Sequence, residues 1–527
     1  MSKRGSIFFA ALLTFTLSSA SSLVSASTLS RDAEIAADLE FFATNTREAM
    51  QRIPLKRDEA GRIRKSSLFS AEAIASRDFV TYKDTWRSKK TSAKRKTSSF
   101  AAPGPDDKPY RVLDNSHLMA RTLEAMEASK LITGNVDTQP WSGDYWGFFK
   151  GTIANRYADS SFPQSQDWKA NFDYVSGAGK TIADIFKTGD LALVNQLSPA
   201  EKYDLVIGQP NGLLTNGMWL AGKKYYDRNG HVEDWMGICD GWASASYMLA
   251  RPRRSIEVMA ADGKTKVTFY PHDVKALASL LWAWGNMSVK GYLGSRCHAK
   301  QPKMDANGRM LEDECFNTNP GSWHMAVVHQ LGFEKKSMAM DATFDYEVWN
   351  QPLRGYKYSY FNPRTMAPTA VLADATVTKT DFVEDKFKAY RSPLAVKIVG
   401  IAMDLTYIAE DEHPRPLPDD SEINDHLVTV RYYYDLELDV DGTIVGGEWY
   451  QNAHPDFLWR PITASHATSN YDSWVMSSWD TTTALPADWK TAAANAAHDR
   501  VPLGRIVEQL VQKSSVNVST LPAALAR

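Results

Sequence analysis

Long hydrophobic runs, abundant cysteine and excess charge are all lacking in this 527-residue chain. The formal net charge is −2, so no overall charge directs it to nucleic acid or to an anionic membrane. After the N-terminal leader, no stretch reaches the roughly 18 consecutive apolar residues typical of a transmembrane helix. We therefore expect neither a nucleic-acid partner nor a membrane partner.

Two local patterns are also missing. His231, His272, His298 and His454 show no metal-ligand spacing, so we expect no zinc site. There are only three cysteines, which excludes a dense disulfide scaffold.

The N-terminus has the pattern of a secretory signal peptide over residues 1–26. Lys3 and Arg4 precede an apolar run from Ile7 to Leu17, and Val24-Ser25-Ala26 forms a small-residue cleavage site. The predicted location is therefore secreted or periplasmic, where disulfides persist.

The cysteine count leaves one thiol unpaired. Cys297 and Cys315 flank a polar segment, and pairing them would stabilise the fold by about 3 kcal/mol. Cys239 then remains, either as an intermolecular partner or as a reactive thiol. A buried, inert cysteine stays open as the alternative.

Four regions follow from composition. Residues 30–50 predict an amphipathic helix capped by Ser30 and ended by Pro54, and residues 86–105 are basic and linker-like. We expect a signal peptide over 1–26, a helical segment with basic linker over 27–105, a catalytic body over 106–465 and a partly helical tail over 466–527. The 27–105 region is either a propeptide or a flexible extension.

The body predicts an α+β fold with a helical first half and an antiparallel, sheet-rich second half. Helical patterns cover residues 239–250 and 272–286, whereas strand patterns cover 395–407, 427–438 and 443–450. Asp441-Gly442 is a hairpin turn signal between the last two strands.

Cys239 has the surroundings of a nucleophile. Gly237 precedes it and small residues follow it, which predicts a cysteine at a helix N-terminus. The helix dipole there favours the thiolate, and the backbone N–H of Cys239 can serve as half of an oxyanion hole.

Thiol chemistry on an amide also needs an acid–base partner. A hairpin centred on Gly332-Phe333 would place His324 opposite Asp341, so that the carboxylate fixes the imidazole tautomer. We therefore predict Cys239, His324 and Asp341 as a catalytic triad, with His329 as the alternative base.

One acidic stretch suggests calcium. Asp435, Glu437, Asp439 and Asp441 alternate along a predicted strand and could ligate calcium through oxygen. A solvated hairpin face is the more ordinary interpretation.

Several blocks resemble the transglutaminase elicitors of oomycete cell walls, a family with relatives in marine bacteria. The segment Glu347-Val348-Trp349-Asn350-Gln351-Pro352-Leu353-Arg354-Gly355-Tyr356-Lys357 is similar to the surface peptide by which plants recognise that family. The resemblance extends over about 135–460 and includes Pro140-Trp141, the Gly-Ile-Cys block at Cys239, and His454-Pro455-Asp456-Phe457-Leu458-Trp459.

The resemblance implies a papain-like thiol enzyme that crosslinks proteins. A glutamine side chain would form a thioester with Cys239, and a lysine or other amine would resolve it. Protein substrates with glutamine and lysine side chains are the implied partners. No cofactor is implied for the chemistry, although calcium supports activity in that family.

We expect four tryptophans to line the cleft: Trp235, Trp242, Trp323 and Trp349. Two other readings stay open. A papain-like protease or glutamine deamidase would use water as the acceptor, and a non-enzymatic surface-binding protein would use no acceptor at all.

Overall fold

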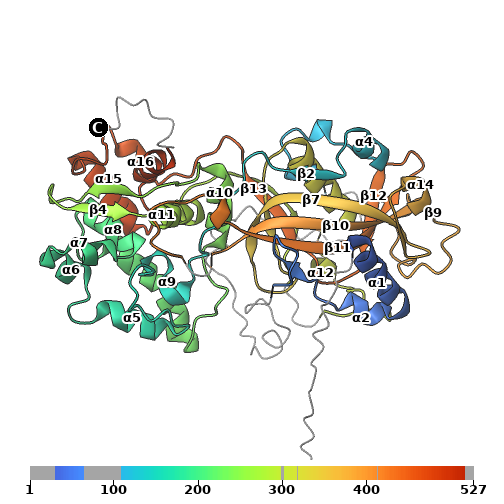
Figure 1. Cartoon of the computed structure of the whole chain (residues 1–527), viewed down its shortest axis with the longest axis horizontal. Helices are drawn as coiled ribbons and strands as arrows, with labels where there is room; N and C mark the ends of the chain where they lie inside the picture. The colour runs from blue at the N-terminus through green and yellow to red at the C-terminus, as the bar shows by residue number, and fades with distance from the viewer. Residues whose placement is uncertain (1–29, 65–107, 298–301, 317, 412–413, 517–527) are drawn as a thin grey trace, which may run out of the picture.

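The computed structural model describes residues 30–64, 108–297, 302–316, 318–411 and 414–516. The predicted signal peptide and the predicted basic linker at 86–105 lie outside the described residues. The described chain forms a helical lobe and a sheet lobe side by side (Figure 1). The mixed helical and antiparallel-sheet class predicted from the sequence is confirmed.

The helical lobe contains a two-stranded hairpin, β3 (Ile256–Met259) and β4 (Lys266–Phe269), among its helices. Its helices are α5 (Trp168–Ser176), α6 (Ile182–Thr188), α7 (Leu191–Asn195), α8 (Pro199–Ile207), α9 (Leu213–Asn229), α10 (Cys239–Met248), α11 (Pro271–Trp284), α15 (Ala487–His498) and α16 (Gly504–Ser515). The predicted helices over 239–250 and 272–286 correspond to α10 and α11.

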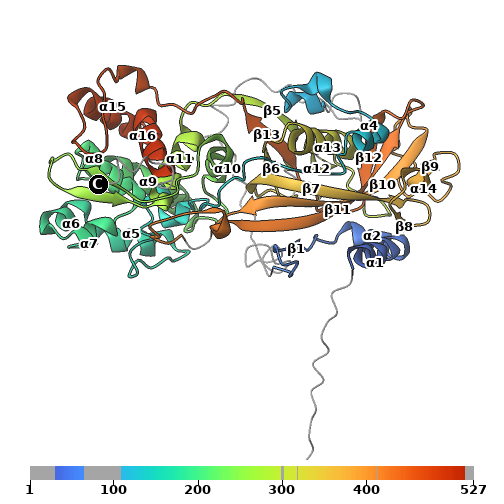
Figure 2. The same ribbon diagram turned by 45° about the horizontal axis from the view of Figure 1, so that its top comes forward.

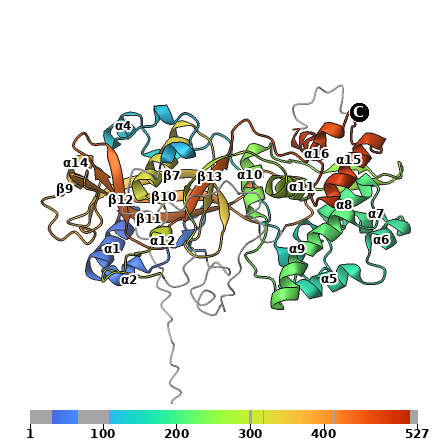
Figure 3. The same ribbon diagram turned by 180° about the vertical axis from the view of Figure 1, so that it is seen from behind.

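The C-terminal helices belong to this lobe. Seen from behind, α15 and α16 lie against α8 and α11 (Figure 3). Ala496 and Leu510 are buried in the same core as α8, and Leu503 N donates to the Tyr203 hydroxyl at 2.8 Å. Residues 487–515 are thus an integral part of the helical lobe, whereas the domain boundaries themselves stay a prediction.

A close helix contact supports the start of α10. A Cβ atom on Gly241 would lie 2.1 Å from the carbonyl oxygen of Ser279 in α11, so only glycine permits this approach. The small residues after Cys239 therefore let α10 pack directly on α11, which fixes the helix end that carries the cysteine.

The sheet lobe is built on an antiparallel sheet, eleven-stranded within the described residues. Its main order is β1 (Lys56–Arg57), β11 (His426–Leu438), β10 (Lys397–Ala409), β7 (Asn350–Asn362), β6 (Ala339–Asp341), β13 (Phe457–Pro461) and β5 (Val289–Gly294). Short strands extend it: β2 (Thr133–Asn135) and β8 (Ala367–Thr369) on β7, β9 (Thr376–Thr378) on β10, and β12 (Ile444–Trp449) on β11. The predicted strands over 395–407, 427–438 and 443–450 are confirmed as β10, β11 and β12.

Helices cover both faces of the sheet. α4 (Leu123–Ala128), α12 (Asp313–Phe316) and α13 (Pro320–Val327) lie on one side, and α1 (Arg31–Thr44) with α2 (Thr46–Met50) lies on the other (Figure 2). The short helix α14 (Leu372–Ala375) lies beside β7 and β8. On β11, Tyr432 and Tyr434 belong to the core under α13, whereas Tyr433 belongs to the core under α1. Side chains alternate along a strand, so covering both faces buries β11 without a break from Tyr432 to Leu438.

The predicted helix over 30–50 is confirmed, with a break at Asn45 between α1 and α2. The Ser30 side chain caps α1 by accepting from Ala33 N. Phe42 stacks on Tyr450 with ring centroids 4.4 Å apart, and Arg31 pairs with Asp404 on β10 at 2.6 Å. The N-terminal segment is therefore docked on the sheet.

The predicted hairpin between His324 and Asp341 is wrong. Asn319 accepts from Gly321 N as an N-cap, Pro320 occupies the first turn, and α13 runs directly into a π-helix at Val328–Phe333. Asp341 instead pairs with Asn350 of β7.

The predicted solvated acidic face holds for Asp439 and Asp441, which are half-buried and exposed at the turn after β11, but it is wrong for the other two residues. Asp435 and Glu437 are fully buried, and Arg391 binds both of them, through Nη1 at 2.5 Å and 3.3 Å. This arrangement does not fit a calcium ion, because the Arg391 guanidinium already binds both carboxyl groups.

Candidate active site

Cys239 is the first residue of α10 and is 3% exposed. The preceding turn is held by Ile238 N, which donates to the Tyr145 carbonyl at 2.8 Å. A Cβ atom at Gly237 would lie 2.5 Å from that same carbonyl, so the turn requires glycine. The sequence expectation of a cysteine at a helix N-terminus behind a glycine turn is confirmed.

The other two cysteines, Cys297 and Cys315, form a disulfide. Cys239 is thus the one cysteine of the chain that lies outside a disulfide. Its sulfur is the natural candidate for thiol chemistry at this site.

Groups from the sheet lobe surround the Cys239 sulfur. Sγ lies 3.5 Å from the carbonyl oxygen of Val348 and 3.5 Å from Nδ2 of Asn350, the first residue of β7. Trp459 of β13 donates its indole N–H to Oδ1 of Asn350 at 2.6 Å. The site therefore forms where α10 of the helical lobe meets β7 and β13 of the sheet lobe.

Asp341 lies next to this cluster, at the end of β6. It is directly opposite Asn350 in the antiparallel pair, so the two side chains share a face with Cβ atoms about 5 Å apart. Its Oδ1 accepts from Thr343 Oγ1 at 2.7 Å and from Trp349 N at 2.9 Å. Its Oδ2 is buried without a hydrogen-bond partner among the described residues. Burial raises the pKa of Asp341 to about 7.

A second buried carboxyl group, Asp456, belongs to the same polar cluster. Its backbone N donates to the Thr343 carbonyl at 3.2 Å, and its Oδ2 accepts from Cys297 N at 3.0 Å. Burial raises the pKa of Asp456 well above its usual value, and the charge of Asp341 raises it further, whereas Arg296 opposes the rise. Two interacting carboxyl groups in a desolvated site retain a proton near neutral pH.

His324 lies far from Cys239. It is fully buried in α13, with Nδ1 2.7 Å from the Tyr434 hydroxyl and its ring 4.9 Å from the ring of Tyr358. Tyr358 is eight residues along β7 from Asn350, which is roughly 26 Å of strand. Burial lowers the pKa of His324 to about 3. The geometry gives His324 no contact with the Cys239 cluster.

His329, the alternative base, lies in the π-helix. Its ring stacks on Phe333, and Nε2 is 3.6 Å from Glu334. Burial lowers the pKa of His329.

The four predicted cleft tryptophans divide into two pairs. Trp349 packs against Tyr145 at 5.0 Å and donates to Asp341, and the half-buried Trp235 packs against Tyr346 at 5.8 Å. Trp349 is itself 1% exposed, so only Trp235 can line an open cleft, and the assignment of the fully buried Trp242 and Trp323 to the cleft is wrong. They are buried because Trp242 faces the helical core and Trp323 lies in α13 against β11 and β12.

Asn350, Trp459 and Asp456 were not assigned roles from the sequence. All three lie in blocks that carry the family resemblance, the Trp-Asn-Gln-Pro block and the His-Pro-Asp-Phe-Leu-Trp block. That signal could have selected them, although their convergence on Cys239 needs the tertiary fold.

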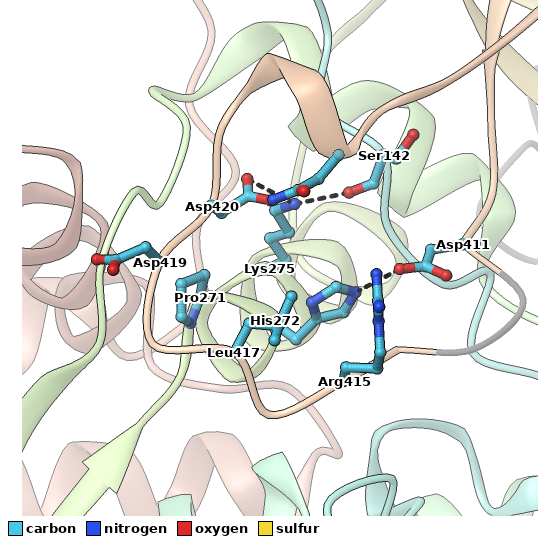
Figure 4. A pocket seen from close by; sticks show the side chains of 10 residues that line it. Ser142, Pro271, His272, Lys275, Asp411, Arg415, Leu417, Asp419 and Asp420 are labelled. Carbon is cyan, nitrogen blue, oxygen red and sulfur yellow. Dashed lines mark hydrogen bonds and ion pairs between the residues drawn. The ribbon is translucent and has the colours of Figure 1, made fainter.

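A separate polar hollow lies at the N-terminal end of α11 (Figure 4). Lys275 Nζ lies 2.9 Å from Asp420 and donates to the Ser142 carbonyl at 2.8 Å, and His272 lies 3.4 Å from Asp411. These pairs tie the segment between β10 and β11 to the helical lobe, and neither Cys239 nor Asn350 lines the hollow.

None of the helices in the described part of the chain has the length and apolar character needed to cross a bilayer. Within the same residues, no three side chains of histidine, cysteine, aspartate or glutamate cluster closely enough to hold a metal ion.

The transglutaminase elicitor family model matches residues 116–479. That range is more than half of the chain, so this protein belongs to the transglutaminase elicitor family. The crystal structure of the GP42 transglutaminase from Phytophthora sojae is similar, with a TM-score of 0.49 and 20% sequence identity. The similarity covers 79% of this chain and 99% of that chain. The curated proteins give no significant match. The resemblance inferred from the sequence is thus confirmed at the level of the family.

Proposed function

We propose that this protein is a protein-glutamine γ-glutamyltransferase with Cys239 as its nucleophile. The sulfur attacks the carboxamide carbon of a glutamine side chain, the C–N bond breaks, and a thioester forms. The thiol proton ends on the departing ammonia. A lysine side chain or another primary amine then attacks the thioester, forms a new amide and returns a proton to the sulfur.

The observation that carries this proposal is the place of Cys239. A cysteine outside any disulfide begins a helix and contacts an amide donor, in a chain of the transglutaminase elicitor family. Helix N-termini favour the thiolate form of cysteine.

We assign the proton relay to Asp341 rather than to His324. Asp341 shares a strand face with Asn350, and its Oδ2 atom has no hydrogen-bond partner among the described residues. Its pKa, which burial raises to about 7, suits a group that accepts and returns a proton near neutral pH.

We further propose that the protein is secreted and acts on extracellular proteins. The disulfide between Cys297 and Cys315 and the family both favour an oxidising compartment. Calcium dependence stays a prediction that the assay below tests directly.

The test is incorporation of a fluorescent primary amine into a glutamine-rich protein by wild type and by Cys239→Ala, each with and without calcium. We expect labelling by wild type and none by Cys239→Ala. Asn286→Ala is the matched control, because Asn286 bonds Asn470 at the surface. A difference between the calcium arms would establish whether calcium is needed.

Two results would replace the proposal. Cys239-dependent glutamine deamidation or peptide cleavage without amine incorporation would mean that water is the acceptor. Equal behaviour of wild type and Cys239→Ala in all three assays would favour a non-enzymatic surface-binding protein.

A further inference from the structure

The orientation of the Asn350 side chain is fixed by its partner. The indole N–H of Trp459 can only donate, so the Asn350 atom that lies 2.6 Å from it must be the carbonyl oxygen. The amide nitrogen then faces the Cys239 sulfur at 3.5 Å. The usual ambiguity between the two ends of an asparagine amide is therefore absent here.

This chain of contacts is held in a dry environment. Asn350, Trp459 and Cys239 are 2%, 3% and 3% exposed. A hydrogen bond to a charged atom gains strength where water is excluded, because no solvent competes for the donor.

Trp459 is itself fixed by packing. Its indole is buried in a small cluster with Ala243 of α10 and Ala339 of β6, and its ring stacks on Tyr292 at 5.8 Å. The Trp459 indole, which donates to Asn350, is therefore held from two sides. Helix α10, which carries Cys239, packs on it from one lobe, and strands β5 and β6 pack on it from the other.

The two contacts of the sulfur respond differently to ionisation. The neutral thiol donates to the Val348 carbonyl, and this bond is lost when the proton leaves. The N–H from Asn350 remains and becomes a charge-assisted hydrogen bond to the thiolate. The Val348 carbonyl therefore favours the neutral thiol, whereas the Asn350 N–H favours the thiolate, so removing the Asn350 donor should raise the pKa of the thiol.

We propose that Asn350 is a catalytic residue that donates its amide N–H to the Cys239 thiolate, and that Trp459 is a positioning residue that aims this amide. This inference rests on the proposed function only in taking Cys239 as the nucleophile.

Other charged groups surround the site and influence the same titration. They are Asp240 on α10, Asp341 on β6, Asp345 and Glu347 before β7, Asp456 before β13, and Arg296 after β5. All of them remain in the variants below, so the comparison isolates the amide donor.

The test is a pH titration of the Cys239 thiol, followed by the ultraviolet absorbance of its thiolate. For each protein, the absorbance of the same protein carrying Cys239→Ala is subtracted at every pH. This difference cancels the tyrosines and needs no substrate. We expect Asn350→Ala to raise the midpoint by about one unit, which is the order of a single hydrogen bond to a charged group. Trp459→Phe keeps an aromatic side chain but removes the indole N–H, and we expect a smaller shift in the same direction.

Trp474→Phe is the matched control, because Trp474 is 49% exposed, and it should leave the midpoint unchanged. If Asn350→Ala does not fold, Trp459→Phe alone carries the test. Midpoints equal to wild type in the folded variants would overturn the inference.

Failure of this inference and failure of the proposed function are distinguishable. Shifted midpoints in a protein that incorporates no amine would support the Asn350 hydrogen bond and reject the transglutaminase reaction. Unshifted midpoints in a protein that does incorporate amine would reject the role of Asn350 and keep the reaction.

Discussion

Arg391 should be one of the most costly residues to remove from the sheet lobe. Its guanidinium binds Asp435 through Nη1 at 2.5 Å, Asp385 through Nε at 2.9 Å and Glu437 through Nη1 at 3.3 Å. All four side chains are at most 3% exposed. Arg391→Met fills similar volume but leaves three carboxyl groups without their cation. Breaking a buried ion pair from one side costs about 3–5 kcal/mol.

The assay is urea denaturation near pH 7, followed by tryptophan fluorescence. Such a loss is a large part of the roughly 5–15 kcal/mol that stabilises a typical domain. The control is Arg505→Met, since Arg505 and Glu508 are 3.8 Å apart and exposed, and such pairs contribute at most about 1 kcal/mol. A loss for Arg391→Met no larger than the control would refute the reasoning.

The same variant should respond to pH in a defined direction. Burial raises the pKa of Asp435 and of Glu437. A carboxyl group whose folded pKa exceeds its unfolded value binds more protons in the folded state, so stability falls as pH rises above the unfolded value of about 4. Without the Arg391 charge these pKa values rise further. The deficit of Arg391→Met should therefore be larger near pH 7 than near pH 5, and a constant deficit would contradict this account.

Three further predictions concern the site and the N-terminal helix. His324→Gln should keep wild-type amine incorporation. It should lose only about 1 kcal/mol of stability, because it loses the hydrogen bond to Tyr434. A folded variant that is about 10²-fold slower would restore His324 as the base. Asp341→Asn should lower the rate by about 10²-fold or more and remove from the rate profile the limb near pH 7 where wild type titrates this carboxyl group. An unchanged profile would exclude the relay. Phe42→Ala should lower the free energy of unfolding by about 3–5 kcal/mol, because it leaves a cavity against Tyr450. The loss should be seen as faster proteolysis of α1. Resistance to proteolysis equal to wild type would show that the docking of α1 does not depend on this ring.

Local patterns predicted those parts of the fold whose signals are local. Ser30 predicted the start of α1, and the small residues after Cys239 predicted α10. Asp441-Gly442 predicted the turn between β11 and β12. Each of these depends on the geometry of a few neighbouring residues, which the sequence displays directly.

The region from Asn319 to Phe333 shows where this approach failed. The apolar run Met325-Ala326-Val327-Val328 fits a buried strand and a buried helix equally well by periodicity. Asn319 followed by Pro320 is a helix start signal, and it favours the helix that is observed as α13. The hairpin error then produced the contact between His324 and Asp341.

The partners of Cys239 could not be placed from spacing alone. Asn350 and Trp459 are more than 100 residues away from Cys239, and they reach it only because β7 and β13 flank β6 in the sheet. Likewise, nothing local in Asp435 and Glu437 indicates that Arg391 will cover them. Non-local pairing of this kind is set by the whole fold.

The most direct test of the central claim is detection of the acyl-enzyme. Wild type is mixed with a short blocked glutamine peptide without any amine acceptor, and intact mass and released ammonia are measured together. We expect one adduct on Cys239, equal in mass to the peptide minus ammonia, matched by one ammonia per enzyme and discharged by added primary amine. An adduct on another residue, or ammonia release that persists in Cys239→Ala, would contradict the account.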